Sequence, residues 1–461
     1  MPSLAKSWTV SKDRKTYTFK LRDDVAFHGN DLFKPLRKFN ANDVVYTFKS
    51  QMDTKHPLAI PAANYEYFKA MELDQIISDV KKTDDYTVVF ELKKPEAPFL
   101  ANLAMDFASI LSEEYAQTLV KSGKGLKTLE TNPVGTGPFV FKSYQKDSAV
   151  RYSAFDQYFK GKPKIEQLIF VITTDSTVRL QKMKTGECHV MSEPQPQDIE
   201  TIQKTAGLKL VSTEGLNVGY VAFNTSKKPF DNLKVRTAIT HALNKKSYID
   251  AIYKGQGTIA KNPIPPTMWS YNKATADDEY NIEKAKQLLK EAGFADGFET
   301  ELWTLPVSRP YMPNGKKLGE LMQADLAKVG IKVKLQTFDW PTYLEKAKNG
   351  EHAFIQFGWT GDNGDPDNFL NVLLGCSAVK AGSNYARWCQ PEFNALIQKA
   401  KEETTQAKRS DLYQKAQVIF KKEKPWVAVA HSRQNKVISD KVTGYTIDPF
   451  GHEQFESVDL K

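Results

Sequence analysis

The sequence predicts an α/β fold organised in two lobes. The chain has 461 residues, and a single hydrophobic core stops growing at about 250 to 300 residues, so at least two packed units are expected. From about residue 214 onward, helical patterns alternate with strand patterns, which is typical of βαβ units around a parallel sheet. The part of the chain before that point mixes hairpin strands with short helices.

The first predicted lobe covers residues 1–213 and 435–461. Strand patterns with alternating polar and apolar residues occur at WTVS, KTYTFKL, DDYTVVFEL and KIEQLIFVIT, and the first two predict a hairpin. Helices are expected over PEAPFLANLAMDFASILS and over DSTVRLQKMKTGEC, the latter capped by Asp175 or Ser176. The tail KVTGYTIDPFGHEQFESVDL returns to strands and turns, which suits a chain that crosses back into its first lobe.

The second predicted lobe covers residues 214–434. Apolar residues at helical spacing predict helices over LKVRTAITHALNKKSYIDAIY, over NIEKAKQLLKEAG, which ends at Gly293, and over KKLGELMQADLAKVG. Strands are predicted at FETELWTL, IKVKLQTF and AFIQFGW. This order of elements indicates that the second lobe is the α/β one.

The chain is predicted to open with a strand hairpin. The start MPSLAKSWTVSKDRKTYTFKLR does not show the charged leader, apolar core and small-residue cleavage site of an export signal. Because the domain begins with a completed hairpin, we expect that its first elements precede Met1. No apolar stretch approaches the roughly 18 to 20 residues that a membrane-spanning helix needs.

Charge and motif patterns argue against several function classes. The Lys and Arg residues behind the net charge of +9 are scattered among Asp and Glu and form no basic block, so no nucleic-acid partner is expected. There is no G-x-S-x-G, no P-loop and no H-E-x-x-H, and the seven histidines never pair at helical spacing. We therefore expect that the protein is not an enzyme and has no cofactor and no metal site. A peptide-acting hydrolase is the alternative function class.

Three cysteines are present: Cys188, Cys376 and Cys389. The last two lie 13 positions apart around a polar stretch, a spacing suited to closing a surface loop with about 3 kcal/mol of stabilisation. We expect a disulfide there, with two unpaired thiols as the alternative. Cys188 is then left over. An odd number of cysteines in an exported protein indicates that the partner of the remaining one lies outside this sequence.

The segment GWTGDNGDPDNF places three carboxylates, Asp362, Asp365 and Asp367, in a Gly-rich loop directly after an apolar strand. The loop lacks the Glu that a calcium loop carries at its twelfth position, and nothing marks one acid as the proton donor of a glycosidase. For Asp365 and Asp367 we favour hydrogen bonds to backbone turns. Asp362 lies beside Trp359 at a strand end, where α/β sheets bind ligands, and its carboxylate suits a primary ammonium.

A second candidate segment is TLPVSRPYMPNGKK, in which Arg309 follows a predicted strand. Pro306 and Pro310 stiffen the loop, so the guanidinium can make a planar, bidentate contact with a carboxylate. An ordinary salt bridge is the alternative interpretation.

The strongest sequence signals are long segments spread over the whole chain: LAKSWTVSKDRKTYTFKLRDDVAFHGN, NANDVVYTF, PEAPFLANLAMDFASIL, NPVGTGPF, GLNVGY, KVRTAI, NPIPPTMW, SRPY, GEH and GWTGDNGDPDNF. In these segments the chain resembles the peptide and nickel class of extracytoplasmic solute-binding proteins, family 5, from Ser3 to Asp459. The resemblance implies a two-lobed periplasmic-binding-protein fold of the Venus-flytrap type (type II, cluster C), with a hinge between the lobes. It also implies a monomer in the periplasm, free or lipid-anchored, that closes on a short peptide and delivers it to the permease subunits of an ABC importer.

The resemblance also assigns roles to residues. Asp362 matches the acid that holds the α-ammonium of the ligand, and Arg309 matches the base that holds its carboxylate. The full predicted ligand-binding set is Asp362, Arg309, Trp359, Thr360, Gly358 and Tyr311. Cys376 and Cys389 match a family disulfide, and Cys188 matches a cysteine whose partner precedes this chain.

Three ligands stay open at this stage: a dipeptide or short peptide, glutathione, and haem. Two rigid charges of opposite sign favour a short zwitterion, because their separation sets the length of the ligand. Glutathione also carries an ammonium and carboxylates. Haem offers only propionates, which Arg309 would hold and Asp362 would repel.

Overall fold

The computed structural model describes residues 3–461, and contacts divide the chain into two compact units. The first unit comprises Met1–His189, Ser439–Thr446 and Gln454–Lys461, and the second comprises Val190–Ile438 and Ile447–Glu453. The contacts therefore group residues 190–213 with the second unit, whereas the sequence analysis assigned them to the first lobe. The lobe boundaries themselves stay a prediction.

The first unit contains a four-stranded sheet with the order β1-β2-β4-β3 and a three-stranded sheet with the order β5-β6-β7, and all neighbours in both are antiparallel. The predicted hairpin at the start is confirmed as β1 paired with β2. Asp175 caps α7 by accepting a hydrogen bond from the Val178 N–H, as one of the two predicted caps. The elements are β1 (Ala5–Val10), β2 (Thr16–Leu21), α1 (Ala41–Met52), α2 (Glu66–Ala70), α3 (Leu73–Ile76), β3 (Ile77–Asp84), β4 (Thr87–Leu92), α4 (Phe99–Asn102), the 3-10 turn η1 (Asp106–Ala108), α5 (Glu113–Lys121), α6 (Thr128–Thr131), β5 (Phe139–Gln145), β6 (Ala149–Ala154), β7 (Gln167–Val171), α7 (Ser176–Lys184), β16 (Val442–Thr443) and β17 (Asp459–Leu460).

The predicted helix over PEAPFLANLAMDFASILS is wrong in length. It shortens to the single turn α4 followed by η1. Beyond Leu103 the backbone hydrogen bonds change from the i−4 to the i−3 pattern, starting with Ala104 N–H to Ala101 O. Buried side chains then recur every three residues, at Phe99, Asn102 and Met105, which fits 3-10 turns better than an α-helix.

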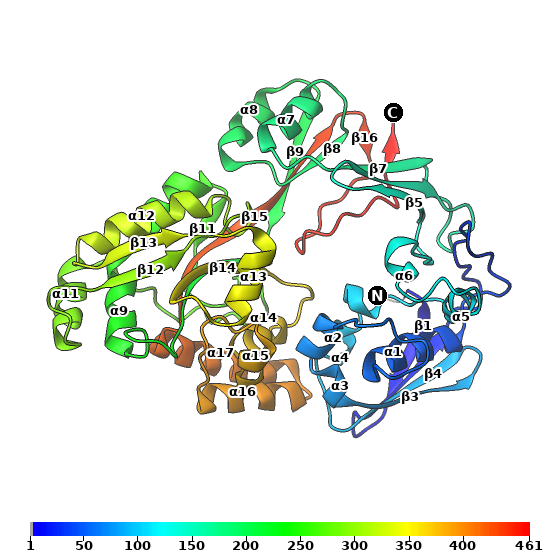
Figure 1. The fold of residues 1–461 in the computed structure, drawn as a ribbon, viewed down its shortest axis with the longest axis horizontal. Coiled ribbons are helices and arrows are strands. Elements are labelled where there is room, and N and C mark those ends of the chain that lie inside the picture. Colours follow the sequence, from blue (N-terminus) through cyan, green and yellow to red (C-terminus); the bar gives the residue numbers. More distant parts are fainter. Residues whose placement is uncertain (1–2) are drawn as a thin grey trace. The chain divides into compact units, whose positions relative to one another are not determined.

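The second unit is built around one eight-stranded sheet, whose main order is β11-β15-β10-β14-β12-β13, with β8 and β9 also paired to β15. In Figure 1, α14, α15, α16 and α17 gather in one helical group beneath the sheet. The elements are β8 (Val190–Ser192), the 3-10 turn η2 (Pro196–Asp198), α8 (Ile199–Lys204), β9 (Leu208–Glu214), β10 (Asn217–Phe223), α9 (Leu233–Ala242), α10 (Lys245–Tyr248), the π-turn η3 (Ile249–Tyr253), β11 (Gly257–Ile259), α11 (Ile282–Glu291), β12 (Glu299–Trp303), α12 (Gly315–Ala327), β13 (Lys332–Gln336), α13 (Trp340–Lys348), β14 (Phe354–Thr360), α14 (Asp367–Leu374), α15 (Cys376–Ala381), α16 (Pro391–Glu402), α17 (Gln406–Glu423) and β15 (Trp426–Ser439).

The long helix predicted over LKVRTAITHALNKKSYIDAIY is interrupted. Leu243 has an extended backbone, so α9 ends there. The side chain of Asn244 then accepts a hydrogen bond from the Ser247 N–H and caps α10. An Asn in this place competes with the helical backbone for its own hydrogen bonds, which is why apolar spacing alone predicts one helix where there are two.

The βαβ prediction for the second unit is confirmed at one end of the sheet, where β14, β12 and β13 are neighbours. β12 runs parallel to both β13 and β14, whereas β10 is antiparallel to β14 and β15. All of β10 and most of β14 are buried, as expected for central strands covered on both faces. The carboxyl ends of the neighbouring parallel strands β12 and β14 therefore lie at the same edge of the sheet.

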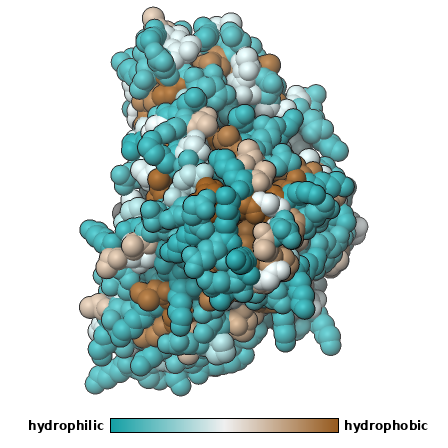
Figure 2. Space-filling view, turned by 90° about the vertical axis from the view of Figure 1, so that its left-hand side faces the viewer, coloured by the Kyte–Doolittle hydropathy of each residue, from teal (hydrophilic) through white to brown (hydrophobic). Residues whose placement is uncertain are grey.

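The face shown in Figure 2 is mainly hydrophilic. Figure 2 shows one face on which hydrophobic residues occur in small groups among polar ones. Among residues 3–461, no helix combines the length and the apolar run needed to cross a bilayer.

Candidate ligand-binding site

Arg309 and Asp362 follow the ends of two neighbouring parallel strands. Trp303, the last residue of β12, pairs with Ile355 in β14. Arg309 lies in the loop after β12, and Asp362 lies two residues after the end of β14. Loops at the carboxyl ends of adjacent parallel strands are where α/β sheets place ligand-binding groups.

Two glycines let the loop after β12 pass close over the sheet. Gly219 of β10 is directly opposite Gly358 of β14. A Cβ atom at Gly358 would come within 2.1 Å of the Tyr311 ring, and one at Gly219 within 2.2 Å of the Tyr311 carbonyl oxygen. The same carbonyl accepts a hydrogen bond of 2.7 Å from the Tyr253 hydroxyl. The loop that carries Arg309 is thereby fixed against the end of β14.

The Arg309 side chain lies over an aromatic ring. Its backbone forms a two-way bridge with Met312, with Arg309 N–H to Met312 O at 3.2 Å and Met312 N–H to Arg309 O at 2.9 Å. The guanidinium carbon is 5.4 Å from the centre of the Trp340 ring, close enough for a cation–π contact. Within the described part of the chain, the guanidinium makes no salt bridge, so its charge is available to a ligand carboxylate.

Tyr311 is buried and carries a neutral hydroxyl. Burial raises the pKa of Tyr311 to about 12, although the nearby Arg309 guanidinium opposes this rise. At neutral pH the phenol therefore stays protonated and can act as a hydrogen-bond donor.

Asp362 and Trp359 are joined through Asn368, in the first turn of α14. The Asn368 side-chain oxygen accepts from Trp359 Nε1 and from the Asp362 backbone N–H, both at 2.9 Å. The Asn368 Nδ2 donates to Asp362 Oδ2 at 3.0 Å. Asp362 is half-buried, and so is Thr360, which pairs with Asn217 of β10.

Asp365, another carboxylate of the loop, has structural partners. Asp365 Oδ1 accepts a hydrogen bond of 3.0 Å from the Asp367 N–H, which confirms the turn predicted for Asp365. Both Asp365 oxygens also accept from the Arg409 guanidinium at 2.8 Å. Arg409 is buried, and it further donates to Ala400 O and to the Tyr413 hydroxyl.

The structure thus forms two groups at one edge of the sheet. Arg309, Tyr311 and Gly358 are in contact or in one loop, and Asp362 is tied to Trp359. The sequence analysis missed Asn368 and Arg409, which hold the second group. Within residues 3–461, no set of three His, Cys, Asp or Glu side chains is placed to hold a metal ion.

Arg309 also lines a polar pocket of the second unit that the sequence analysis did not foresee. Its walls come from loops after β8 and β12 and from β15, and they include Glu193, Gln195, Ser308, Arg309, Arg433 and Asn435. Gln195 Nε2 donates to Ser308 Oγ at 3.0 Å, which ties the two loops together.

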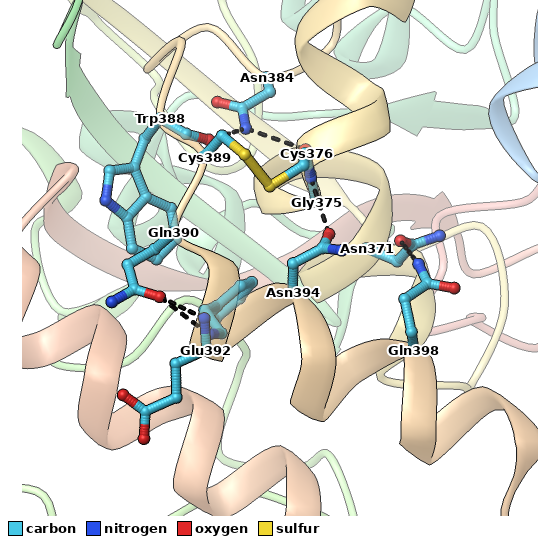
Figure 3. The surroundings of a disulfide bond; sticks show 11 residues. Asn371, Gly375, Cys376, Asn384, Trp388, Cys389, Gln390, Glu392, Asn394 and Gln398 are labelled. Atoms are coloured by element: carbon cyan, nitrogen blue, oxygen red, sulfur yellow. Dashed lines mark hydrogen bonds between the residues drawn. A yellow bond between two sulfur atoms is a disulfide. The ribbon is translucent and has the colours of Figure 1, made fainter.

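The predicted disulfide is confirmed between Cys376 and Cys389. Figure 3 shows Asn384 between the two cysteine segments, where its Nδ2 donates to Gly375 O at 3.2 Å and to Trp388 O at 2.8 Å. The bridge and this amide therefore hold the same loop. Cys188 is half-buried and unbridged in the described part of the chain, and burial raises the pKa of its thiol.

Removing this bridge with Cys376→Ser and Cys389→Ser together is expected to lower the free energy of unfolding by about 3 kcal/mol, because the unfolded chain regains the conformational entropy that the bridge removes from a loop of this length. Urea denaturation followed by circular dichroism measures the change. Cys188→Ser serves as the thiol control and should cost less than about 1 kcal/mol. A double variant as stable as the parent protein would contradict the prediction.

Comparison with known proteins places the whole chain in one family. Residues 1–381 match the bacterial extracellular solute-binding proteins, family 5 Middle. The chain is 50% identical to the dipeptide-binding protein of Escherichia coli, over 100% of this chain and 86% of that protein. It is 46% identical to heme-binding protein A of Haemophilus influenzae, over 100% of this chain and 84% of that protein.

A solved structure gives the same result for the fold. The dipeptide-binding protein from Pseudoalteromonas in complex with Met-Leu superposes with a TM-score of 0.94 and 39% identity, covering 100% of this chain and 90% of that one. The α/β fold expected from the resemblance is confirmed. The chain belongs to family 5 of the bacterial extracellular solute-binding proteins.

Proposed function

We propose that this solute-binding protein captures dipeptides or short peptides and delivers them to the permease of an ABC importer. The observation that carries the proposal is the pair of opposite charges, Asp362 and Arg309, beyond the ends of two neighbouring parallel strands. The peptide-binding names of its relatives and the Met-Leu complex of a structural neighbour support it.

The two charges suit the two ends of a peptide. A carboxylate that is half-buried and already hydrogen-bonded on one oxygen can accept from a primary ammonium. A guanidinium that stacks on Trp340 and lacks a salt bridge among the described residues can hold a carboxylate in a planar contact. Trp359, Thr360, Gly358 and Tyr311 complete the proposed site.

Haem is the second candidate ligand, because a relative of similar identity is named a heme-binding protein. Arg309 would bind a propionate, whereas Asp362 would repel it. Glutathione, which has an ammonium as well as carboxylates, would use both charges. Competition between a dipeptide and either compound for the purified protein separates the three ligands.

The proposal also covers the location, the oligomeric state and the partner of the protein. We place the protein in the periplasm, free or lipid-anchored, acting as a monomer that meets the transmembrane subunits of its importer. It would bind peptides without hydrolysing them and without a cofactor. Peptide recovered intact after incubation with the protein is the expected result, and cleavage that is lost in Asp362→Asn would instead support a hydrolase.

The decisive experiment is calorimetric titration of Asp362→Asn with a dipeptide and with its N-acetylated form. We expect the affinity for the free-amine dipeptide to fall about 100-fold, since removing one partner of a hydrogen-bonded charge pair costs about 2 to 5 kcal/mol. The N-acetylated form lacks the ammonium, so its weaker binding should change less than about threefold.

Asp411→Asn is the charge-matched control for this titration. Asp411 lies on α17 and pairs with Lys415 in an exposed salt bridge, so its loss should leave both affinities unchanged. Equal losses for the free-amine and acetylated peptides in Asp362→Asn would count against two-ended recognition.

A further inference from the structure

Asn368 has all the main hydrogen-bonding groups of its side chain engaged by two residues of the proposed site. It is 1% exposed. Its oxygen accepts from Trp359 Nε1 and from the Asp362 N–H, and its Nδ2 donates to the Asp362 carboxylate. Asn368 therefore contacts both the backbone and the carboxylate of Asp362.

The orientation of the Asn368 amide follows from its partners. Trp359 Nε1 and the Asp362 backbone N–H can only donate, so the atom facing them has to be the amide oxygen. The NH₂ group then has to face Asp362 Oδ2. The two contacts with Asp362 close a ring, which fixes the main chain and the plane of the carboxylate together.

The helix that carries Asn368 is itself anchored at its start. The Asp367 N–H donates to Asp365, and Asp365 forms a bidentate, buried pair with Arg409 of α17. The Arg409 guanidinium also lies 5.3 Å from the Trp269 ring centre, and the Trp269 Nε1 donates to Gly364 O in the same loop. Asn368 therefore holds Asp362 against a rigid support.

We infer that Asn368 is a positioning residue that holds the Asp362 carboxylate ready for the ammonium of the ligand. A carboxylate fixed before binding loses no rotational freedom when the ligand arrives, so the affinity gains what a mobile side chain would lose. The inference rests on the proposed function, because it assigns Asn368 a role in the same site.

A double-mutant cycle tests this role. Asn368→Ala should weaken a free-amine dipeptide about 10- to 100-fold in the parent protein, the range expected for losing a hydrogen bond to a charged group. In the Asp362→Asn background, the same substitution should cost less than about threefold, because the group that Asn368 positions is gone. A residue with only a structural role would show equal losses in both backgrounds.

Asn371→Ala is the matched control. Asn371 lies one turn further along α14, is also 1% exposed, and accepts a hydrogen bond from Gln398 rather than from the proposed site. The Asn371→Ala substitution should lower the melting temperature about as much as Asn368→Ala does. It should change the affinity for the dipeptide less than about twofold. Asn368→Ser, which leaves a smaller cavity, replaces the alanine variant if that variant does not fold.

The outcomes are distinguishable. A loss confined to the protein that retains Asp362 supports the inference. Equal losses in both backgrounds, with the parent protein still binding the dipeptide, overturn the inference alone. A parent protein that binds no dipeptide overturns the proposed function, and the inference with it.

Discussion

Asp365→Asn is expected to lower the free energy of unfolding by about 3 to 5 kcal/mol, because it leaves the buried Arg409 guanidinium without its counter-charge. The Asp365 side chain also accepts from the Asp367 N–H in the first turn of α14. The amide oxygen of an asparagine can keep this hydrogen bond, so the expected loss comes from the unpaired guanidinium. Urea denaturation at pH 7, followed by tryptophan fluorescence, measures the change in stability.

Two further variants sharpen this prediction. Asp411→Asn makes the same change in net charge, but it breaks an exposed pair with Lys415 and should cost no more than about 1 kcal/mol. Adding Arg409→Met to Asp365→Asn removes the orphaned charge and should recover part of the loss. If Asp365→Asn costs no more than Asp411→Asn, the buried pair is not what stabilises the loop.

Acidification from pH 7 to pH 5 is expected to lower the free energy of unfolding by about 4 kcal/mol through two histidines. Burial lowers the pKa of His352 and of His431 from 6.5 to about 4. In each ring one nitrogen faces a carbonyl oxygen, Tyr385 O or Asn217 O, and so has to donate to it. The other nitrogen of each ring is buried without a hydrogen-bond partner among the described residues.

The sign of this pH dependence follows from the pKa values of the histidines in the folded and unfolded states. Unfolded histidines take up a proton near pH 6.5, whereas the folded ones resist protonation down to about pH 4. The stability they contribute is therefore complete above pH 6.5, is lost as the pH falls, and is exhausted below about pH 4. Carboxylates such as Asp278, whose pKa the neighbouring Lys421 and Lys424 lower against the effect of burial, add their loss only at more acidic pH.

Urea denaturation at pH 7, 6 and 5 checks this dependence. His352→Gln and His431→Gln should each flatten the slope, since each removes one of the histidines whose pKa burial lowers. His28, whose pKa burial also lowers, keeps part of the slope in both variants. Parallel slopes for the parent protein and both buried variants would contradict the assignment.

The sequence predicted much of the second unit because its signals are local. Alternation and helical spacing are visible within single segments, and they place Arg309 and Asp362 after strands that do become neighbours. The helix over PEAPFLANLAMDFASILS was predicted from the same kind of local signal and is wrong in length. Its hydrogen bonds change to the i−3 pattern in a segment where Phe99 and Met105 are buried, and the segment alone does not reveal that burial.

The residues that support the proposed site, Arg409 and Asn368, could not be predicted from the sequence for a different reason. Arg409 lies 44 positions from its partner Asp365, and on α17 it resembles any other basic residue of an amphipathic helix. Asn368 follows a Gly-rich loop in which several polar side chains could equally have capped a turn. Only the folded geometry selects which of them contacts Asp362.

The bare backbone at Gly219 and Gly358 limits how this binding protein could be redesigned. Any larger residue at either position would collide with Tyr311, so attempts to retune ligand choice by exchanging these two glycines would displace the Arg309 loop instead. Laboratory evolution aimed at a new cargo would therefore have to vary other positions, such as the segments after β12 and β14, and keep both glycines.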